Sequence, residues 1–95
     1  MSHIAHDKRR LTARLNRLAG QIEGVRRMVE QAAGDDDQTC FRVLQQMAAA
    51  RGAMNGLMAE LIEQHLEHHI VRVNGPSKRR SGAGELIRVL RSFSK

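Results

Sequence analysis

Apolar side chains recur every three or four residues along the first third of the chain. The series has spacings of 4, 3, 4, 3 and 4, at Leu11, Leu15, Leu18, Ile22, Val25 and Val29. Such spacing gathers apolar groups into one seam along a helix, whereas a strand would alternate at every second residue. The pattern predicts an amphipathic helix over about residues 7–32, followed by a stop at Gly34.

A second, longer apolar pattern follows the acidic run Asp35-Asp36-Asp37. These aspartates offer N-caps, so we expect the next helix to begin near Asp37. No proline interrupts the chain from there to about Val71, and the apolar positions cover a wide helical face. The run Asn74-Gly75-Pro76 then ends a predicted second helix over about residues 37–71.

The remaining chain predicts one more short helix. Gly82 and Gly84 indicate a loose connector, and apolar residues return within residues 84–93. We therefore predict an all-α protomer, in which two long helices form an antiparallel hairpin and a short helix follows at the C-terminus. The two long helices exclude a helix-turn-helix, which needs two short helices at a tight turn. We expect one domain, residues 1–95, that pairs with copies of itself in four-helix-bundle fashion.

Charge is distributed unevenly along the chain, whose net charge is +6. Residues 1–34 sum to +4, residues 35–70 to −4 and residues 71–95 to +6. Two basic blocks around an acidic middle suit a polyanionic partner such as nucleic acid, although a basic surface can also serve only solubility. Aromatic residues make up 2% of the chain, which leaves little to stack on bases and favours duplex DNA over single strands.

Three arginines of the first predicted helix, Arg10, Arg14 and Arg17, each stand one residue before a leucine of the apolar seam. They form a basic stripe. This stripe either follows a phosphate backbone or is an ordinary solvated helix face. The basicity of the whole chain favours the DNA-binding interpretation.

Several other function classes lack their sequence features. No Ser/His/Asp set, paired carboxylates or phosphate-binding glycine loop is present, so we do not expect an enzyme. No apolar run approaches the roughly 20 residues of a membrane span, and the N-terminus has no signal-peptide apolar region. Cys40 is the single cysteine and cannot form an internal disulfide. We expect a cytoplasmic protein without a membrane partner.

The segment EQHLEHHI, residues 63–70, contains three of the five histidines. His65 and His69 stand four residues apart, which on a helix places both imidazoles on one face at chelating separation. His68 points about 60° away from that face. Two ligands are too few for tight binding, so the pair is either part of a metal site or a solvent-facing helix end.

Cys40 is the natural candidate for a further ligand, because the first turn of a helix favours a thiolate. It could also be a small buried residue. On one straight helix Cys40 and His65 would lie roughly 37 Å apart at 1.5 Å per residue, too far to share an ion. Either Cys40 is irrelevant to the histidines, or an antiparallel second chain brings its Cys40 to this end of the helix.

The helical stretches, Cys40 and the histidine pair together resemble a known protein family. The stretches RLNRLAGQIEGVRRM (residues 14–28) and VLQQMAAARGAMNGLMAE (residues 43–60), with Cys40, His65 and His69 at the matching spacing, resemble the CsoR/RcnR family of metal-sensing transcriptional repressors. The resemblance covers almost the whole chain. It implies an all-helical homotetramer, a dimer of dimers, with metal sites between protomers and no helix-turn-helix.

The resemblance also implies a ligand set. Copper sensors of the family have Cys, His and Cys at the three central positions; here the third is His69, which disfavours Cu(I) because soft thiolates select that ion. The nickel/cobalt branch, RcnR and DmeR, has an N-terminal His followed by Cys, His and His. This chain matches that branch at His3, Cys40, His65 and His69, and loss of the initiator methionine would free the amine of Ser2 as a further ligand. The expected regulatory ligand is Ni(II) or Co(II), with Zn(II) as an alternative.

The implied function is repression: the apo form binds duplex operator DNA, and metal binding releases the DNA and derepresses an efflux gene. Arg14 and Arg17 match basic positions that the family uses on DNA. Arg51, inside the second resembling stretch, is either a DNA-facing or a structural residue. His6 and His68 are additional potential ligands.

Two other functions stay open. A formaldehyde-responsive branch, FrmR, uses an N-terminal amine with a cysteine, but typically has proline at position 2 and lacks the second histidine. Ser2 and His69 therefore favour the metal-sensing branch. The third interpretation is a metal-storage or buffering protein with an incidental basic surface.

Overall fold

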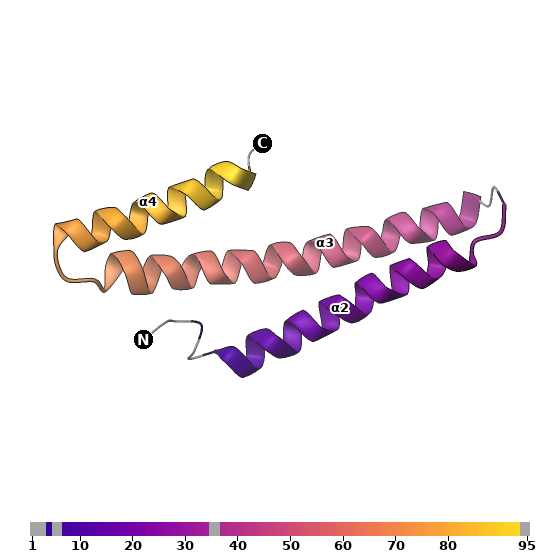
Figure 1. Cartoon of the computed structure of the whole chain (residues 1–95), viewed down its shortest axis with the longest axis horizontal. Helices are drawn as coiled ribbons and strands as arrows, with labels where there is room; N and C mark the ends of the chain where they lie inside the picture. The colour runs from indigo at the N-terminus through magenta and orange to yellow at the C-terminus, as the bar shows by residue number, and fades with distance from the viewer. Residues whose placement is uncertain (1–3, 5–6, 35–36, 94–95) are drawn as a thin grey trace. The chain divides into compact units, whose positions relative to one another are not determined.

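The computed structural model describes residue 4, residues 7–34 and residues 37–93. The elements in this part of the chain are α2 (Lys8–Gln31), α3 (Asp37–Leu66), the π-helical turn η1 (Glu67–Val71) and α4 (Pro76–Phe93) (Figure 1). The prediction of an all-α chain with a long middle helix is confirmed. The chain divides into two compact units, one of residues 7–57 and one that combines residues 58–95 with the N-terminal segment before Asp7.

In the unit of residues 7–57, α2 and the first part of α3 form a hairpin (Figure 1). The N–H of Leu11 donates to the carbonyl oxygen of Asp7 at 3.0 Å, so α2 begins directly after Asp7. At its other end Gly34 has φ +64°, a left-handed conformation that side chains disfavour, and the chain reverses there. The helix α3 then begins at Asp37, as predicted.

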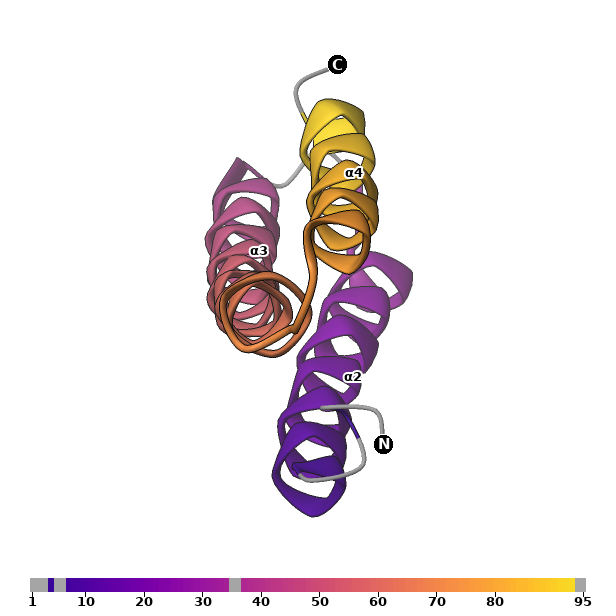
Figure 2. The ribbon, with the colours of Figure 1, turned by 90° about the vertical axis from the view of Figure 1, so that its left-hand side faces the viewer.

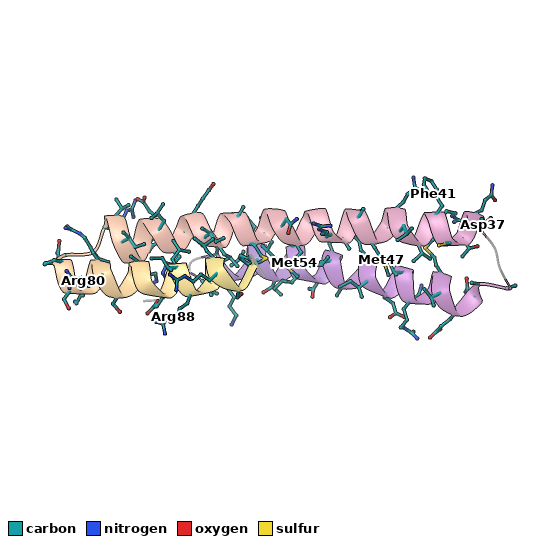
Figure 3. The ribbon with its side chains drawn as sticks, turned by 90° about the horizontal axis from the view of Figure 1, so that it is seen from above. Asp37, Phe41, Met47, Met54, Arg80 and Arg88 are labelled. Carbon is teal, nitrogen blue, oxygen red and sulfur yellow. The ribbon has the colours of Figure 1, made fainter. Side chains whose placement is uncertain are left out.

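The core of this unit is small. Among the described residues the buried apolar side chains are Leu11, Leu18, Ala50 and Leu57. Other positions of the predicted seam stay open, with Leu15 47% exposed and both Ile22 and Val29 55% exposed. Phe41 is 62% exposed and projects from the outer side of α3 (Figure 3). Exposed apolar surface on this scale is typical of a face that contacts a partner.

In the other unit, α3 widens into η1 before the chain turns. The N–H of Arg72 donates to the carbonyl oxygen of Glu67, five residues earlier, at 3.0 Å. Gly75 has φ +99°, and α4 runs back beside η1 and the end of α3 (Figure 2). The apolar pattern predicts an unbroken second helix to about Val71. It does not reveal η1, because a single π-helical turn is too short to change the spacing of apolar residues.

The third helix is longer than the pattern predicts. The prediction of a connector through Gly82 and Gly84, with a helix only over about residues 84–93, is wrong, because α4 begins at Pro76 and includes both glycines. Proline is favourable at the first helical position, where its missing N–H costs nothing. Gly82 is buried against η1: a Cβ at this residue would stand 2.3 Å from the carbonyl oxygen of His69.

The substitution Gly82→Ala tests whether this close contact fixes α4. A methyl group 2.3 Å from the His69 carbonyl oxygen must displace the helix, so we expect the free energy of unfolding to fall by about 1–3 kcal/mol, as for other overpacked contacts. Gly84→Ala is the matched control, because no atom lies within 4 Å of its Cβ position, and alanine there should stabilise by up to about 1 kcal/mol. Urea unfolding followed by circular dichroism measures both. Equal stability of the two variants would show that the contact does not form in solution.

Candidate metal centre and nucleic-acid interface

Two histidines meet where α3 passes into η1. His65 belongs to the last turn of α3 and His69 to η1, and their ring centroids lie 4.7 Å apart with the planes tilted by 32°. The prediction that they share one face is confirmed. Both residues are half-buried, whereas His68 is exposed. Burial therefore distinguishes the pair from the third histidine of the segment.

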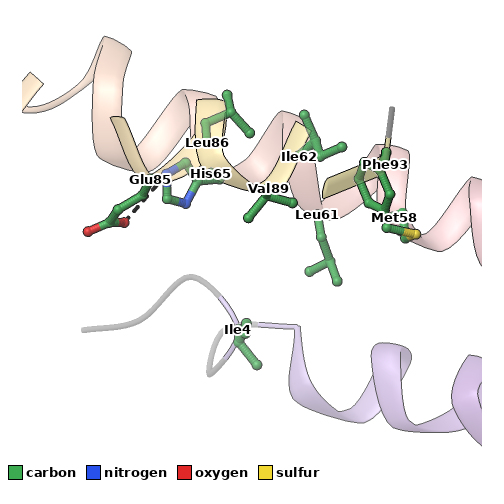
Figure 4. A pocket seen from close by; sticks show the side chains of 9 residues that line it. All are labelled: Ile4, Met58, Leu61, Ile62, His65, Glu85, Leu86, Val89 and Phe93. Atoms are coloured by element: carbon green, nitrogen blue, oxygen red, sulfur yellow. Dashed lines mark ion pairs between the residues drawn. The ribbon is translucent and has the colours of Figure 1, made fainter. Parts of the chain in front are cut away.

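The helix α4 supplies polar partners for His65. Its Nε2 lies 3.0 Å from the carbonyl oxygen of Gly82 and 3.8 Å from Oε2 of Glu85 (Figure 4). A carbonyl oxygen can only accept, so a neutral ring donates from Nε2 and keeps its lone pair on Nδ1. A backbone carbonyl or carboxylate on one ring nitrogen is the usual environment of a histidine whose other nitrogen binds a metal.

An apolar cavity of about 320 Å³ adjoins His65 (Figure 4). Its apolar walls come mainly from α3 and α4, through Met58, Leu61, Ile62, Leu86, Val89 and Phe93. Ile4 completes the lining. Because Ile4 directly follows His3 in the sequence, the chain next to a predicted ligand borders the same cavity as His65.

Cys40 lies in the first turn of α3, and its side chain is exposed. The alternative interpretation of Cys40 as a small buried residue is therefore wrong for the single chain. Within the residues that the structure describes, no three His, Cys, Asp or Glu side chains are grouped so that they could hold a metal ion. His3, His6 and the amine of Ser2 lie outside the described residues. The described part of one chain thus offers a pair of imidazoles rather than a complete site.

Two arginines of the predicted basic stripe border a common groove. Arg14 and Arg17 line it together with Leu18 and Gln21 of α2 and with Ala53 and Leu57 of α3. Arg14 is half-buried, and its Nη2 lies 3.8 Å from the place where a Cβ of Gly56 would stand. A Cβ at Gly56 would therefore make an ordinary van der Waals contact with this guanidinium, and sequence reasoning missed that the two residues lie side by side.

The other two predicted DNA-binding arginines lie apart from this groove. Arg10 Nη2 lies 3.5 Å from Oδ2 of Asp7, and the Arg10 side chain is 49% exposed. Arg51 is exposed on α3. No described contact decides whether Arg51 faces DNA or a polar group in an assembly, so its role stays a prediction.

The second half of α2 is electrically balanced. Arg26 donates from Nε to Oε2 of Glu23 at 2.9 Å and also pairs with Glu30, while Arg27 Nε lies 3.7 Å from Oε1 of Glu23. The hydrogen bond from Arg26 is the main reason that the pKa of Glu23 is lowered, and the same bond raises the pKa of Arg26. Residues 8–22, in contrast, contain basic side chains and no acid. The unbalanced positive charge of α2 is confined to its first half.

Comparison with known proteins gives one consistent result. Residues 7–92 match the family described as metal-sensitive transcriptional repressor. Over 95 residues, with full coverage of both chains, the sequence is 41% identical to the transcriptional repressor RcnR of Citrobacter koseri and 40% identical to that of Salmonella typhimurium. A variant of the formaldehyde-responsive regulator FrmR from Salmonella enterica serovar Typhimurium has a similar solved structure, with a TM-score of 0.81, 38% identity and coverage of 97% of this chain and 99% of that chain. None of the described helices is long and apolar enough to cross a membrane.

Removing the Arg26 hydrogen bond should return the pKa of Glu23 toward its usual 4.5. A lowered pKa means that the folded chain binds this proton less readily than the unfolded chain, so the stabilisation is present above about pH 4.5 and is lost as the pH falls through the lowered value. In Arg26→Gln we therefore expect Glu23 to titrate at higher pH, as followed by NMR of its carboxyl carbon. Arg27→Gln is the control, with a smaller shift. An unchanged Glu23 titration in Arg26→Gln would contradict the assigned cause.

Proposed function

The chain belongs to the family of metal-sensitive transcriptional repressors, and from this premise we propose that it represses a metal efflux gene until Ni(II) or Co(II) binds. The observation that supports this choice most directly is the pair of adjacent imidazoles, His65 and His69, with ring centroids 4.7 Å apart. The apo form binds duplex operator DNA, and the metal-bound form releases it. Residues 1–95 act as one regulatory domain in the cytoplasm, where the operator lies.

Membership of this family settles the class of protein. A transcriptional repressor is a regulator, which confirms the expectation that the chain is not an enzyme. The metal-buffering interpretation is not supported, because the relatives at 40–41% identity are named as repressors along their full length.

The proposed ligands are His65, His69, the Cys40 thiolate of a second chain, and His3 with the amine of Ser2. Imidazole, amine and thiolate together suit borderline divalent ions such as Ni(II) and Co(II), with Zn(II) as an alternative, whereas Cu(I) prefers a softer set. The exposure of Cys40 supports a thiolate donated to another chain. The position of Ile4 beside the His65 cavity supports a ligand from the residue before it.

Association of chains follows from the apolar surface that one chain leaves open. Leu15, Ile22 and Val29 on α2 and Phe41 on α3 all remain about half exposed or more. We propose that copies of the chain cover this surface in a homotetramer, a dimer of dimers built on four-helix bundles. Antiparallel pairing of two α3 helices then places the Cys40 of one chain near the histidine pair of the other.

DNA binding is assigned to Arg10, Arg14, Arg17 and Arg51. The first half of α2 suits a phosphate backbone because its basic side chains face no excess of carboxylates. The groove that Arg14 and Arg17 share gives both guanidinium groups a defined place on the helix hairpin. Such groups position a protein on duplex DNA, and any of them that reaches a base edge also reads sequence.

The proposed switch connects His65 with α4 and with the N-terminal segment. His65 touches Gly82 and Glu85, so ligand binding at this imidazole alters the contacts of α4. Recruitment of His3 also restrains the segment that leads into α2 and its arginines. Metal and DNA then favour different arrangements of the tetramer, and each ligand weakens the binding of the other.

A formaldehyde-responsive function is the second candidate, since a structural neighbour at 38% identity is a formaldehyde-responsive regulator. In that case Cys40 and the N-terminal amine react with the aldehyde, and His69 has no required role. The adjacent histidine pair favours metal sensing, because two imidazoles within ring contact have no task in an aldehyde bridge.

The variant His69→Ala should separate metal sensing from DNA binding. Operator affinity should stay near that of the wild type, because the arginines of α2 and α3 are unchanged. The concentration of Ni(II) or Co(II) that releases the DNA should rise by more than about tenfold, since loss of even an outer partner of a metal ligand typically costs 10- to 100-fold in affinity. Fluorescence anisotropy of an operator duplex, with Ni(II), Co(II), Zn(II), Cu(I) and formaldehyde added separately, measures both quantities.

The matched control for this experiment is His68→Ala, which removes an exposed histidine of the same segment. Its release by metal should stay near that of the wild type. Normal release by Ni(II) and Co(II) from His69→Ala would remove the metal assignment. Release by formaldehyde from both wild type and His69→Ala, with a small mass increase that joins Cys40 to the N-terminal amine, would establish the alternative function.

The double variant Arg14→Ala plus Arg17→Ala should weaken operator binding and make it less dependent on salt. Each lost phosphate contact lowers the slope of log affinity against log salt by about 0.9, so two contacts per chain lower it by roughly 2. Arg26→Ala plus Arg27→Ala is the control, because it removes the same charge from groups paired with Glu23 and Glu30. Equal losses in the two double variants would mean that net charge, rather than the α2 groove, determines binding.

A further inference from the structure

The C-terminal basic block has no part in the function assigned to α2 and α3. Three of its exposed arginines, Arg80, Arg88 and Arg91, belong to α4, whose single acidic residue is Glu85. We propose that these three form a second DNA-binding surface, the α4 arginine face, which contacts the phosphate backbone of duplex DNA without reading its sequence. This inference rests on the proposed function, because it takes DNA to be the polyanion that the chain binds.

Helix geometry gathers the three arginines on one side of α4. At 3.6 residues per turn they fall within an arc of about 80° and along about 16 Å of helix. The opposite side of α4 is occupied, since Gly82 packs on η1 and Val89 lines the cavity beside His65. In Figure 3 the labelled Arg88 projects from α4 on the side away from α3. The arginine face is therefore turned away from the packing of its own unit.

The charge of this face is not neutralised within the described residues. None of Arg80, Arg88 and Arg91 makes an ion pair there. Elsewhere in the chain exposed arginines do have carboxylate partners: Arg72 Nε lies 2.7 Å from Oε1 of Glu67, and Arg26 pairs with Glu23 and Glu30. An ordinary solvated helix face would intersperse such carboxylates, as the second half of α2 does.

Gly84 lies in the middle of the face, four residues from both Arg80 and Arg88. No atom stands within 4 Å of the place where its Cβ would be. Packing therefore explains Gly82 but not Gly84, although glycine costs a helix about 1 kcal/mol relative to alanine. The missing side chain leaves the helix surface open between the arginines, so a phosphate group can approach without displacing anything.

The chemistry of the face favours a duplex backbone over other nucleic-acid features. Phe93, the aromatic residue of α4, lines the cavity on the other side, so the arginine face has no ring for unpaired bases. Guanidinium groups match phosphate oxygens in a bidentate manner. A length of about 16 Å corresponds to roughly five base-pair steps at 3.4 Å each, enough for contacts to several phosphates of one strand.

The test is the triple variant Arg80→Gln, Arg88→Gln, Arg91→Gln in the full chain. Anisotropy titrations use two duplexes of equal length, an operator found by footprinting with the wild type and a random sequence, at several salt concentrations. Affinity for both duplexes should fall by the same factor, roughly tenfold or more, and the salt slope should become shallower by up to about 3 per engaged chain. Gly84→Glu, which places a carboxylate in the middle of the face, should weaken both in the same direction.

The control triple is Arg26→Gln, Arg27→Gln, Arg72→Gln, which removes the same charge from paired groups and should change affinity by much less. Equal losses in the two triples, or no loss in the α4 triple, would overturn the inference. If Arg14→Ala plus Arg17→Ala still weakens operator binding in that case, the proposed function survives. Failure of the wild type to bind either duplex would overturn both. Loss of binding to phosphatidylserine vesicles without any change on DNA would assign the face to a membrane instead.

Discussion

The close contact of α4 with η1 depends on the absence of a side chain at residue 82. A Cβ at Gly82 would lie 2.3 Å from the His69 carbonyl oxygen, so only glycine permits this approach. The approach brings the Gly82 carbonyl oxygen to 3.0 Å from His65 Nε2 and places Glu85 beside the same nitrogen. In a neutral His65 ring this backbone contact places the proton on Nε2 and leaves Nδ1 for the proposed metal. The orientation of the His65 ring therefore depends on how closely α4 packs against η1.

The widened turn η1 contributes to the same arrangement. Its closing bond, from the Arg72 N–H to the Glu67 carbonyl oxygen, spans five residues, and His69 lies inside the turn. π-Helical turns are rare, occur mostly as single turns within α-helices, and are frequent at functional sites. Here η1 contains His69, whose ring lies within contact of the His65 ring. The π-helical turn and the candidate metal ligand His69 thus lie in the same segment.

The sequence predicts the regular parts of this chain well, because apolar spacing and helix stops are local signals. The first helix and the shared face of His65 and His69 follow from helical periodicity, and the start of the second helix at Asp37 follows from the run of aspartates. The start of α4 and the packing of Gly82 do not follow from these signals, because the sequence does not distinguish a glycine required for close packing from a glycine in a flexible connector. Contacts between segments distant in sequence, such as that of Arg14 with Gly56, cannot be predicted from the spacing of apolar residues either. The assignments of His3, Cys40 and Arg51 concern partners beyond one described chain, and they stay predictions.

A small core links the proposed assembly to the proposed metal site. Four apolar side chains are buried in the described part of one chain, while Leu15, Ile22 and Phe41 are about half exposed or more. Burying those side chains requires further chains, and on the proposed arrangement the same association supplies the Cys40 thiolate. A ligand that binds only the assembled form stabilises that form by mass action. Metal affinity, assembly and DNA affinity are then coupled. The apolar surface that a single chain leaves exposed drives the association that brings the histidine pair of one chain to the Cys40 of another.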